Sequence, residues 1–109
     1  MKLIIAIVQD EDASRLISHL MEEDYRVTKL ATTGGFLRSG NTTLLIGVED
    51  SRLQNAMNIV EKVCKSRRQI ATSPAPISGT TGVFVPYPIE VTIGGATVFV
   101  LDVEQFAKF

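Results

Sequence analysis

The chain has 109 residues, of which 45% are hydrophobic and 21% charged, a size and composition typical of one globular domain. Its formal net charge of −1, from 11 Lys and Arg against 12 Asp and Glu, argues against a protein that binds a nucleic-acid backbone. A single cysteine excludes an internal disulfide, no apolar stretch approaches the roughly 20 residues that insert into a membrane, and we expect one cytoplasmic domain over residues 1–109.

The first half of the chain predicts three strands and one helix. Leu3–Val8 is a continuous apolar run, typical of a central strand that is buried on both faces. Asp10 or Asp12 can then cap a helix, and Tyr25–Ala31 and Thr42–Val48 read as two further strands. The helix has one apolar face at the spacing i, i+3, i+4, i+7, i+8, formed by Ala13, Leu16, Ile17, Leu20 and Met21.

The second half predicts a helix, a long loop and a hairpin. Glu49-Asp50-Ser51 suits the start of a helix, because its carboxylates favour the positive end of the helix dipole. Residues 70–88 contain all four prolines and predict a long irregular loop. Ile89–Ile93 and Ala96–Leu101 alternate in hydrophobicity across Gly94-Gly95, which predicts a two-residue hairpin. The apolar face of the second helix comprises Leu53, Ala56, Met57, Val60, Val63 and Cys64.

The resulting order is β-α-β-β-α-β with an extra C-terminal hairpin strand, which predicts an α+β, ferredoxin-like fold. Both helices have one apolar side, so both should cover the same face of an antiparallel sheet. The opposite face keeps apolar residues with no helix above them. We therefore expect subunits to associate through this face.

The residues give little support for an enzyme. His19 lies beside an apolar helical stripe without the rest of a triad, and Cys64 closes an apolar face, so we expect structural roles for both and no catalytic residue. No spacing resembles a metal site. An acylphosphatase-like hydrolase would pair an arginine with an asparagine, as Arg38 and Asn41 could. Its glycine-rich phosphate loop should follow the first strand, where residues 9–12 are instead Gln-Asp-Glu-Asp.

RNA-recognition domains share this order of elements, but they display stacking aromatics on their central strands within a basic context. The first and third predicted strands contain no aromatic residue. We therefore expect no nucleic acid among the partners of this chain.

The segment KLATTGGFLRSGNTTLLIG, residues 29–47, contains more residues suited to ligand binding than a turn requires. Its adjacent glycines, 34 and 35, allow a backbone to approach a ligand closely. Phe36 and Leu37 could enclose a planar base, and the amide of Asn41 could read its edge. A phosphate could meet Arg26 or Arg38. The alternative is a plain hairpin whose Phe36 packs into the core of its own subunit.

Three strings, MKLIIAIVQD, KLATTGGFLRSGNTTLLIGVED and VPYPIEVTIGGATVFVLDVEQF, closely resemble the PstA/DarA family of PII-like proteins, which are bacterial cyclic-di-AMP receptors. The resemblance implies a PII-like homotrimer that holds the dinucleotide in clefts between neighbouring subunits. It implies a non-enzymatic signalling protein with a short T-loop at about 32–41 and a long B-loop at about 70–88. It names no downstream protein partner.

The resemblance also implies a ligand-binding set: Arg26, Thr28, Gly35, Phe36, Leu37, Asn41, Gly47 and Phe99. Three places depart from the family pattern. Lys108 stands where glutamine is common, Asp24 stands where asparagine is common, and the long loop lacks the expected Met-Gly-Gly segment. A lysine can still donate to a phosphate. The alternatives are a PII-like sensor of an adenine mononucleotide such as ATP and, from another class, the acylphosphatase-like hydrolase.

Overall fold

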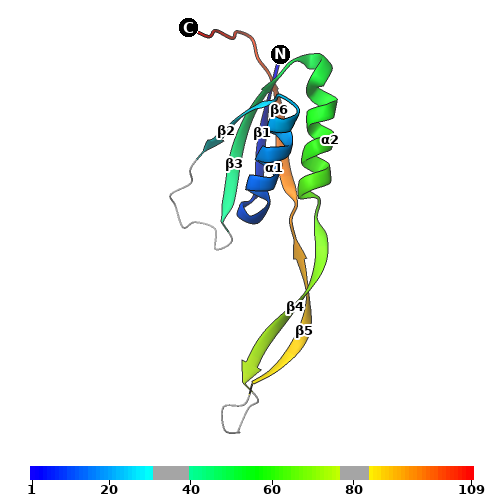
Figure 1. The fold of residues 1–109 in the computed structure, drawn as a ribbon. Coiled ribbons are helices and arrows are strands. Elements are labelled where there is room, and N and C mark those ends of the chain that lie inside the picture. The colour runs from blue at the N-terminus through cyan, green and yellow to red at the C-terminus, as the bar shows by residue number, and fades with distance from the viewer. Residues whose placement is uncertain (31–39, 77–83) are drawn as a thin grey trace.

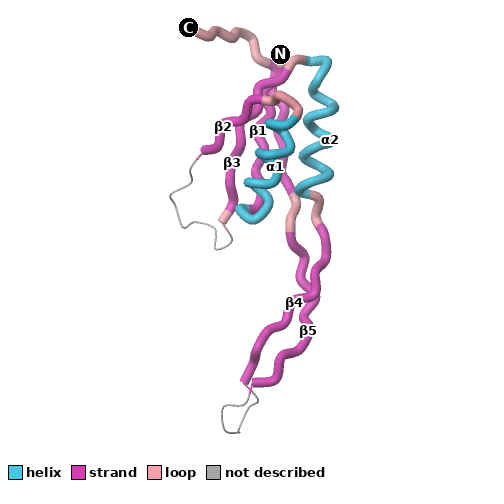
Figure 2. The backbone as a smooth tube through the Cα atoms, viewed as in Figure 1, coloured by secondary structure: helices cyan, strands magenta, loops and turns pink. Residues whose placement is uncertain are grey.

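The computed structural model describes residues 1–30, 40–76 and 84–109, with side chains for all of these except 71–76 and 84–87. Two helices lie on one face of a four-stranded antiparallel sheet of order β2-β3-β1-β6, and β4 and β5 form a separate two-stranded arm (Figure 1, Figure 2). The elements in chain order are β1 (Lys2–Gln9), α1 (Asp10–Glu22), β2 (Arg26–Leu30), β3 (Asn41–Val48), the 3-10 turn η1 (Asp50–Arg52), α2 (Leu53–Cys64), β4 (Arg67–Pro76), β5 (Phe84–Ile93) and β6 (Ala96–Asp102).

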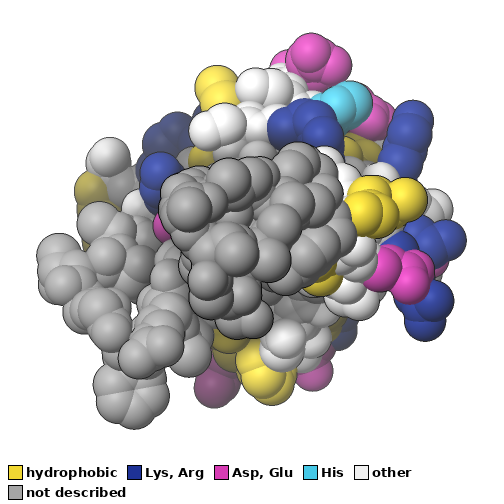
Figure 3. All heavy atoms as spheres, turned by 90° about the horizontal axis from the view of Figure 1, so that it is seen from below, with side chains coloured by type: hydrophobic (Ala, Val, Ile, Leu, Met, Phe, Trp, Pro, Cys, Tyr) yellow, Lys and Arg dark blue, Asp and Glu magenta, His cyan; other side chains and the backbone are white. Residues whose placement is uncertain are grey.

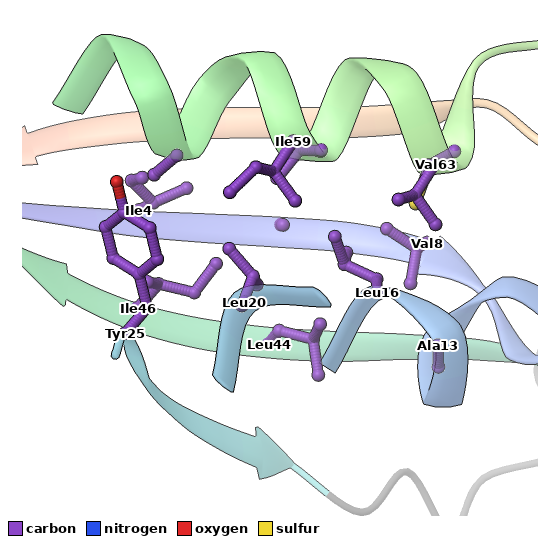
Figure 4. Close-up of a cluster of buried hydrophobic side chains, with 14 of the residues drawn as sticks. Ile4, Val8, Ala13, Leu16, Leu20, Tyr25, Leu44, Ile46, Ile59 and Val63 are labelled. Atoms are coloured by element: carbon purple, nitrogen blue, oxygen red, sulfur yellow. The ribbon is translucent and has the colours of Figure 1, made fainter. Parts of the chain in front are cut away.

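The core lies between the sheet and the two helices. Alternate residues of β1 point toward the helices, because successive side chains of a strand point to opposite faces. Leu16 and Leu20 of α1 and Ile59 and Val63 of α2 meet them there (Figure 4). The β1 and β3 side chains that contribute to this core are Ile4, Ala6, Val8, Leu44, Ile46 and Val48. This mixed fold, with both helices on one face, is consistent with the predicted ferredoxin-like arrangement.

Helix α1 differs in detail from the sequence prediction. Gln9 occupies the N-cap position without a side-chain cap bond, so the predicted capping by Asp10 or Asp12 is wrong. Met21 is 62% exposed and lies outside the apolar face to which the periodicity assigned it. The helix is followed by Asp24 in the left-handed conformation, with φ of 64°. Asparagine and aspartate both tolerate this conformation, so the Asp24 departure is compatible with the end of the helix.

Residues 70–88, predicted as an irregular loop, are strand wherever they are described. Arg67–Pro76 pairs with Phe84–Ile93 in an antiparallel ladder that runs from Arg67 opposite Ile93 to Pro76 opposite Phe84. Proline lacks the N–H that a ladder uses, but it is tolerated where one edge of a strand needs no partner. In a two-stranded arm every strand has such an edge. The four prolines therefore mark an isolated ribbon, which projects beyond the sheet (Figure 1).

The predicted hairpin across Gly94-Gly95 does not form. The two strands exist, but β5 pairs with β4, and β6 pairs with β1. The two glycines, with φ of 78° and 97°, instead carry the chain from the arm into the sheet. A Cβ on Gly94 would lie 2.8 Å from the Lys65 carbonyl oxygen, so no larger residue fits at this corner without displacing backbone.

Candidate functional site

The face of the sheet away from the helices carries every predicted site residue that the structure describes. Residues directly opposite one another in a ladder share a face. Arg26 lies opposite Gly47, which lies opposite Leu3, and Thr28 and Phe99 belong to the next row. The complete rows are Arg26–Gly47–Leu3–Leu101, Thr28–Leu45–Ile5–Phe99, Leu30–Thr43–Ile7–Thr97 and Asn41–Gln9.

This open face is largely apolar. Phe99 and Leu101 are each about half exposed, at 52% and 48%, and no helix of the described residues covers them. A contiguous exposed apolar surface of this kind marks a site for a ligand or another protein chain. The sequence prediction of an uncovered apolar face is confirmed.

A cavity of about 710 Å³ opens on this face at the end of the sheet nearest the C-terminus. Its volume is within the range of small-molecule sites. Its lining includes three residues of the predicted ligand-binding set, Arg26, Thr28 and Gly47. The other lining residues are Met1, Leu3, Leu45, Val103, Phe106, Ala107 and Lys108.

The cavity combines cationic, hydroxyl and apolar groups. Arg26 and Lys108 supply two positive charges, and neither forms an ion pair with another described residue. Thr28 supplies a hydroxyl, and Leu3 and Leu45 form apolar walls. At Gly47 an added Cβ would meet nothing within 4 Å, so the glycine leaves open space above the strand. The cavity therefore suits an anionic ligand that also has an apolar part.

Two predicted residues lie on the same face outside this cavity. Asn41 is six positions along β3 from Gly47, which is about 20 Å at the usual rise of a strand. Phe99 is three strands from Thr28, or about 14 Å at the usual strand spacing. Gly35, Phe36 and Leu37 fall in residues 31–39, outside the described residues.

The N-terminal end of α1 holds the start of β3. The backbone N–H of Asp10 donates to the Gly40 carbonyl at 3.0 Å, and the Thr42 hydroxyl donates to the Asp10 carboxylate at 2.5 Å. A Cβ on Gly40 would lie 2.0 Å from that carboxylate. The end of the segment that leads into β3 is thereby fixed to α1.

The same end of α1 holds both strands of the arm. Arg67, the first residue of β4, donates to Asp12 from Nη2 at 2.8 Å, and this hydrogen bond raises the pKa of Arg67. The Gln9 side chain accepts the backbone N–H of Gly94, beyond β5, at 2.7 Å. The start of β3 and the base of the arm are therefore both attached to residues 9–12 at this end of the sheet.

The described residues give little support for catalysis or for metal binding. Cys64 is fully buried, as predicted, and burial raises the pKa of its thiol to about 11. Such a thiol is protonated near neutral pH and is a poor nucleophile. Among the described residues no group of three or more His, Cys, Asp or Glu is arranged to hold a metal ion. Neither α1 nor α2 has the length and hydrophobicity of a membrane span.

A family model described as cyclic-di-AMP receptor matches residues 1–109. The chain belongs to the cyclic-di-AMP receptor family. The chain is also similar to a functionally unknown protein from Pediococcus pentosaceus ATCC 25745, whose crystal structure matches with a TM-score of 0.78. The two sequences are 45% identical over 99% of this chain and 96% of that protein. The predicted resemblance to the PstA/DarA family is confirmed.

Sequence reasoning did not include several residues of the cavity in this receptor. Leu3 and Leu45 were assigned only to strands, although the register places them beside Gly47 and Thr28. Strand alternation could have found both, once the pairing of β1 with β3 was known. Phe106 lies after the last strand, where no periodicity applies, and only the folded chain places it at the cavity.

Proposed function

We propose that this receptor is a non-enzymatic signalling protein of the cytoplasm that binds cyclic-di-AMP in the clefts between subunits of a PII-like homotrimer. The proposal is carried by one observation: Arg26, Thr28 and Gly47 converge on a single cavity of the open sheet face. Membership of the cyclic-di-AMP receptor family supports the identity of the ligand. Binding is reported through rearrangement of residues 32–41 and 70–88.

The side chains that line the cavity match the chemical groups of at least one half of cyclic-di-AMP. Cyclic-di-AMP carries two phosphodiester charges and two adenines. Arg26 and Lys108 supply two matching cations, and the Thr28 hydroxyl supplies a hydrogen bond. Leu45 and Phe106 offer apolar surface to a base. Gly47 leaves room for the ligand to approach the strand.

The open sheet face supports the association of subunits that the proposed trimer requires. Phe99 and Leu101 are too exposed on an apolar surface to suit an isolated subunit. Phe99 is also about 14 Å from Thr28 across the sheet, at the usual strand spacing. We propose that Phe99 acts on the ligand held by a neighbouring subunit. The site is then shared between subunits, and the apolar face is buried in the same step.

The connection between β2 and β3 supplies the rest of the proposed site. Gly35 would bring backbone donors to the ligand, and Phe36 and Leu37 would enclose the second base. Asn41 would hydrogen-bond to a base edge. This role rests on the family resemblance and on the composition of the segment.

Isothermal calorimetry on the purified protein tests the proposal. We expect cyclic-di-AMP to bind with one ligand per subunit. Phe36→Ala should weaken binding by roughly 1–3 kcal/mol, the scale of one base-stacking contact, while the protein stays folded. Clear binding of ATP with no heat from cyclic-di-AMP would overturn the proposal in favour of a mononucleotide sensor. Turnover of an acyl phosphate that Asn41→Ala abolishes would favour the hydrolase instead.

A further inference from the structure

A second cavity, of about 470 Å³, lies on the helix side of the subunit where the arm begins. Its lining comes from α1, from the end of α2 and from the first residue of β4. The residues are Arg15, His19, Lys62, Val63, Lys65, Ser66 and Arg67. We call it the basic pocket.

The basic pocket concentrates positive charge in a chain whose net charge is −1. Four of the 11 Lys and Arg residues line it. The buried carboxylate of Asp12 offsets one of them. Figure 3 shows Lys and Arg side chains beside the histidine on this end of the molecule. The remaining positive charge is not balanced by an ion pair among the described residues.

The two arginines of the basic pocket are already engaged. Arg15 donates to Asp12 at 3.1 Å and to the Val63 carbonyl at 3.0 Å. Arg67 donates to Asp12 and also to the Lys65 carbonyl at 3.2 Å. These bonds hold the pocket in shape. They leave Lys62 and Lys65 as the cations that an incoming partner can reach, since both are exposed and neither has an ion pair with a described residue.

This arrangement favours an extended acidic chain over a compact phosphate. Phosphate sites usually use convergent backbone N–H groups or free guanidinium forks. Here the guanidiniums are bound to Asp12, and the backbone groups at the end of α2 are carbonyls. Lysines are flexible point charges that suit several carboxylates along a chain. A place in the last turn of a helix would account for Lys62 in α2 and His19 in α1 through the helix dipole, but it does not account for Lys65, which follows α2, as a further cation of the pocket.

We propose that the basic pocket is a docking site for an Asp- and Glu-rich segment of a partner protein. Docked carboxylates would bind Lys62 and Lys65, and Lys65 lies two residues before Arg67, where the arm begins. The partner would therefore dock beside the base of the arm, while Arg15 and Arg67 keep their bonds to Asp12. This site lies on the opposite side of the sheet from the proposed dinucleotide cavity and does not depend on it.

Fluorescence anisotropy tests the proposal with a labelled octapeptide of alternating Asp and Glu and a matched peptide of Asn and Gln. We expect the acidic peptide alone to bind the full-length protein, and half-molar salt to abolish the signal. Lys62→Glu and Lys65→Glu should each weaken it about fivefold, the upper range of one exposed ion pair. Lys29→Glu makes the same change of net charge outside the pocket and should leave binding unchanged.

The proposal fails if the acidic peptide does not bind at low salt, or if Lys29→Glu weakens binding as much as the pocket variants. It also fails if inorganic pyrophosphate displaces the peptide at a concentration at which an equally charged peptide does not.

Calorimetry with cyclic-di-AMP on Lys62→Glu separates the two proposals. A Lys62→Glu protein that binds the dinucleotide normally and the peptide about fivefold more weakly supports both proposals. Absence of dinucleotide binding by the wild type overturns only the first.

Discussion

The carboxylate of Asp12 and the guanidinium of Arg67 form a hydrogen-bonded ion pair at 2.8 Å, with the aspartate 1% exposed. The two residues are 55 positions apart in sequence. Their contact ties the first turn of α1 to the first residue of the arm. Arg15 donates to the same buried carboxylate. Removal of the Asp12 carboxylate would therefore take an acceptor from both guanidiniums.

Asp12→Ala should lower the free energy of unfolding by about 2–3 kcal/mol, the cost of losing a buried hydrogen-bonded carboxylate whose partners keep some access to water. Urea denaturation measures this change. Arg67→Ala and Arg68→Ala form a matched pair on β4. Arg67 binds the buried Asp12, whereas Arg68 pairs with the exposed Glu90, so only Arg67→Ala should lower the midpoint clearly. Equal effects of the two variants would contradict this role for Asp12.

Gly47→Ala should weaken ligand binding without lowering the stability of the fold. An added Cβ meets nothing within 4 Å in the subunit, so the urea midpoint should hold or rise slightly. The methyl group narrows the proposed cyclic-di-AMP cavity, and we expect calorimetry to show weaker binding. Gly94→Ala is the contrast, because φ of 78° and a Cβ at 2.8 Å from a carbonyl oxygen should destabilise the fold by roughly 1–3 kcal/mol. Unchanged cyclic-di-AMP affinity in Gly47→Ala would argue against this cavity.

Phe99→Lys should convert the proposed trimer into monomers. The side chain is half exposed on the open sheet face, so a charge there should spare the subunit fold but oppose burial between subunits. Analytical ultracentrifugation gives the mass, and circular dichroism confirms folding. Met21→Lys replaces an equally exposed apolar residue on the helix side and should leave the mass unchanged. A trimeric Phe99→Lys protein would place the subunit interface elsewhere.

Cys64 predicts a specific loss of stability at alkaline pH. Burial raises the pKa of its thiol to about 11 in the folded state, against an ordinary value of 9.0. The folded state therefore holds this proton more tightly than the unfolded state. Its contribution is fully present below pH 9 and declines as pH rises toward 11. The difference in unfolding free energy between wild type and Cys64→Ala should shrink over this interval in urea titrations. A constant difference would contradict a buried, protonated thiol.

Local pattern predicted the elements that face the core. The runs of residues 3–8 and 42–48 became β1 and β3. The apolar faces of both helices were predicted with two errors: Met21 is exposed at the end of α1, and Ile59 of α2 is buried in the core although it was not included. These signals are strong because burial selects apolar side chains at the period of the element. The uncovered sheet face followed from the same count of apolar faces.

The pairing of the strands was harder to predict from the sequence. Gly94-Gly95 has the composition of a hairpin turn, yet it joins β5 of the arm to β6 of the sheet, and β6 pairs with β1 rather than with β5. The arm was mistaken for a loop, because prolines oppose a central strand but not a free ribbon. Both errors concern which strand meets which, a question that local composition does not answer.

By itself the sequence determined the helices and the central strands, which depend on residue type and on spacing within a short stretch. The resemblance of three long strings to a known family predicted the family and pointed to Arg26, Thr28 and Gly47, which line the cavity. Only the tertiary structure decided that Phe106 and Lys108 join that cavity and that Asp12 is buried against Arg15 and Arg67. These contacts join segments far apart in sequence, so they exist only after the strands have found their register and the helices have closed over the sheet.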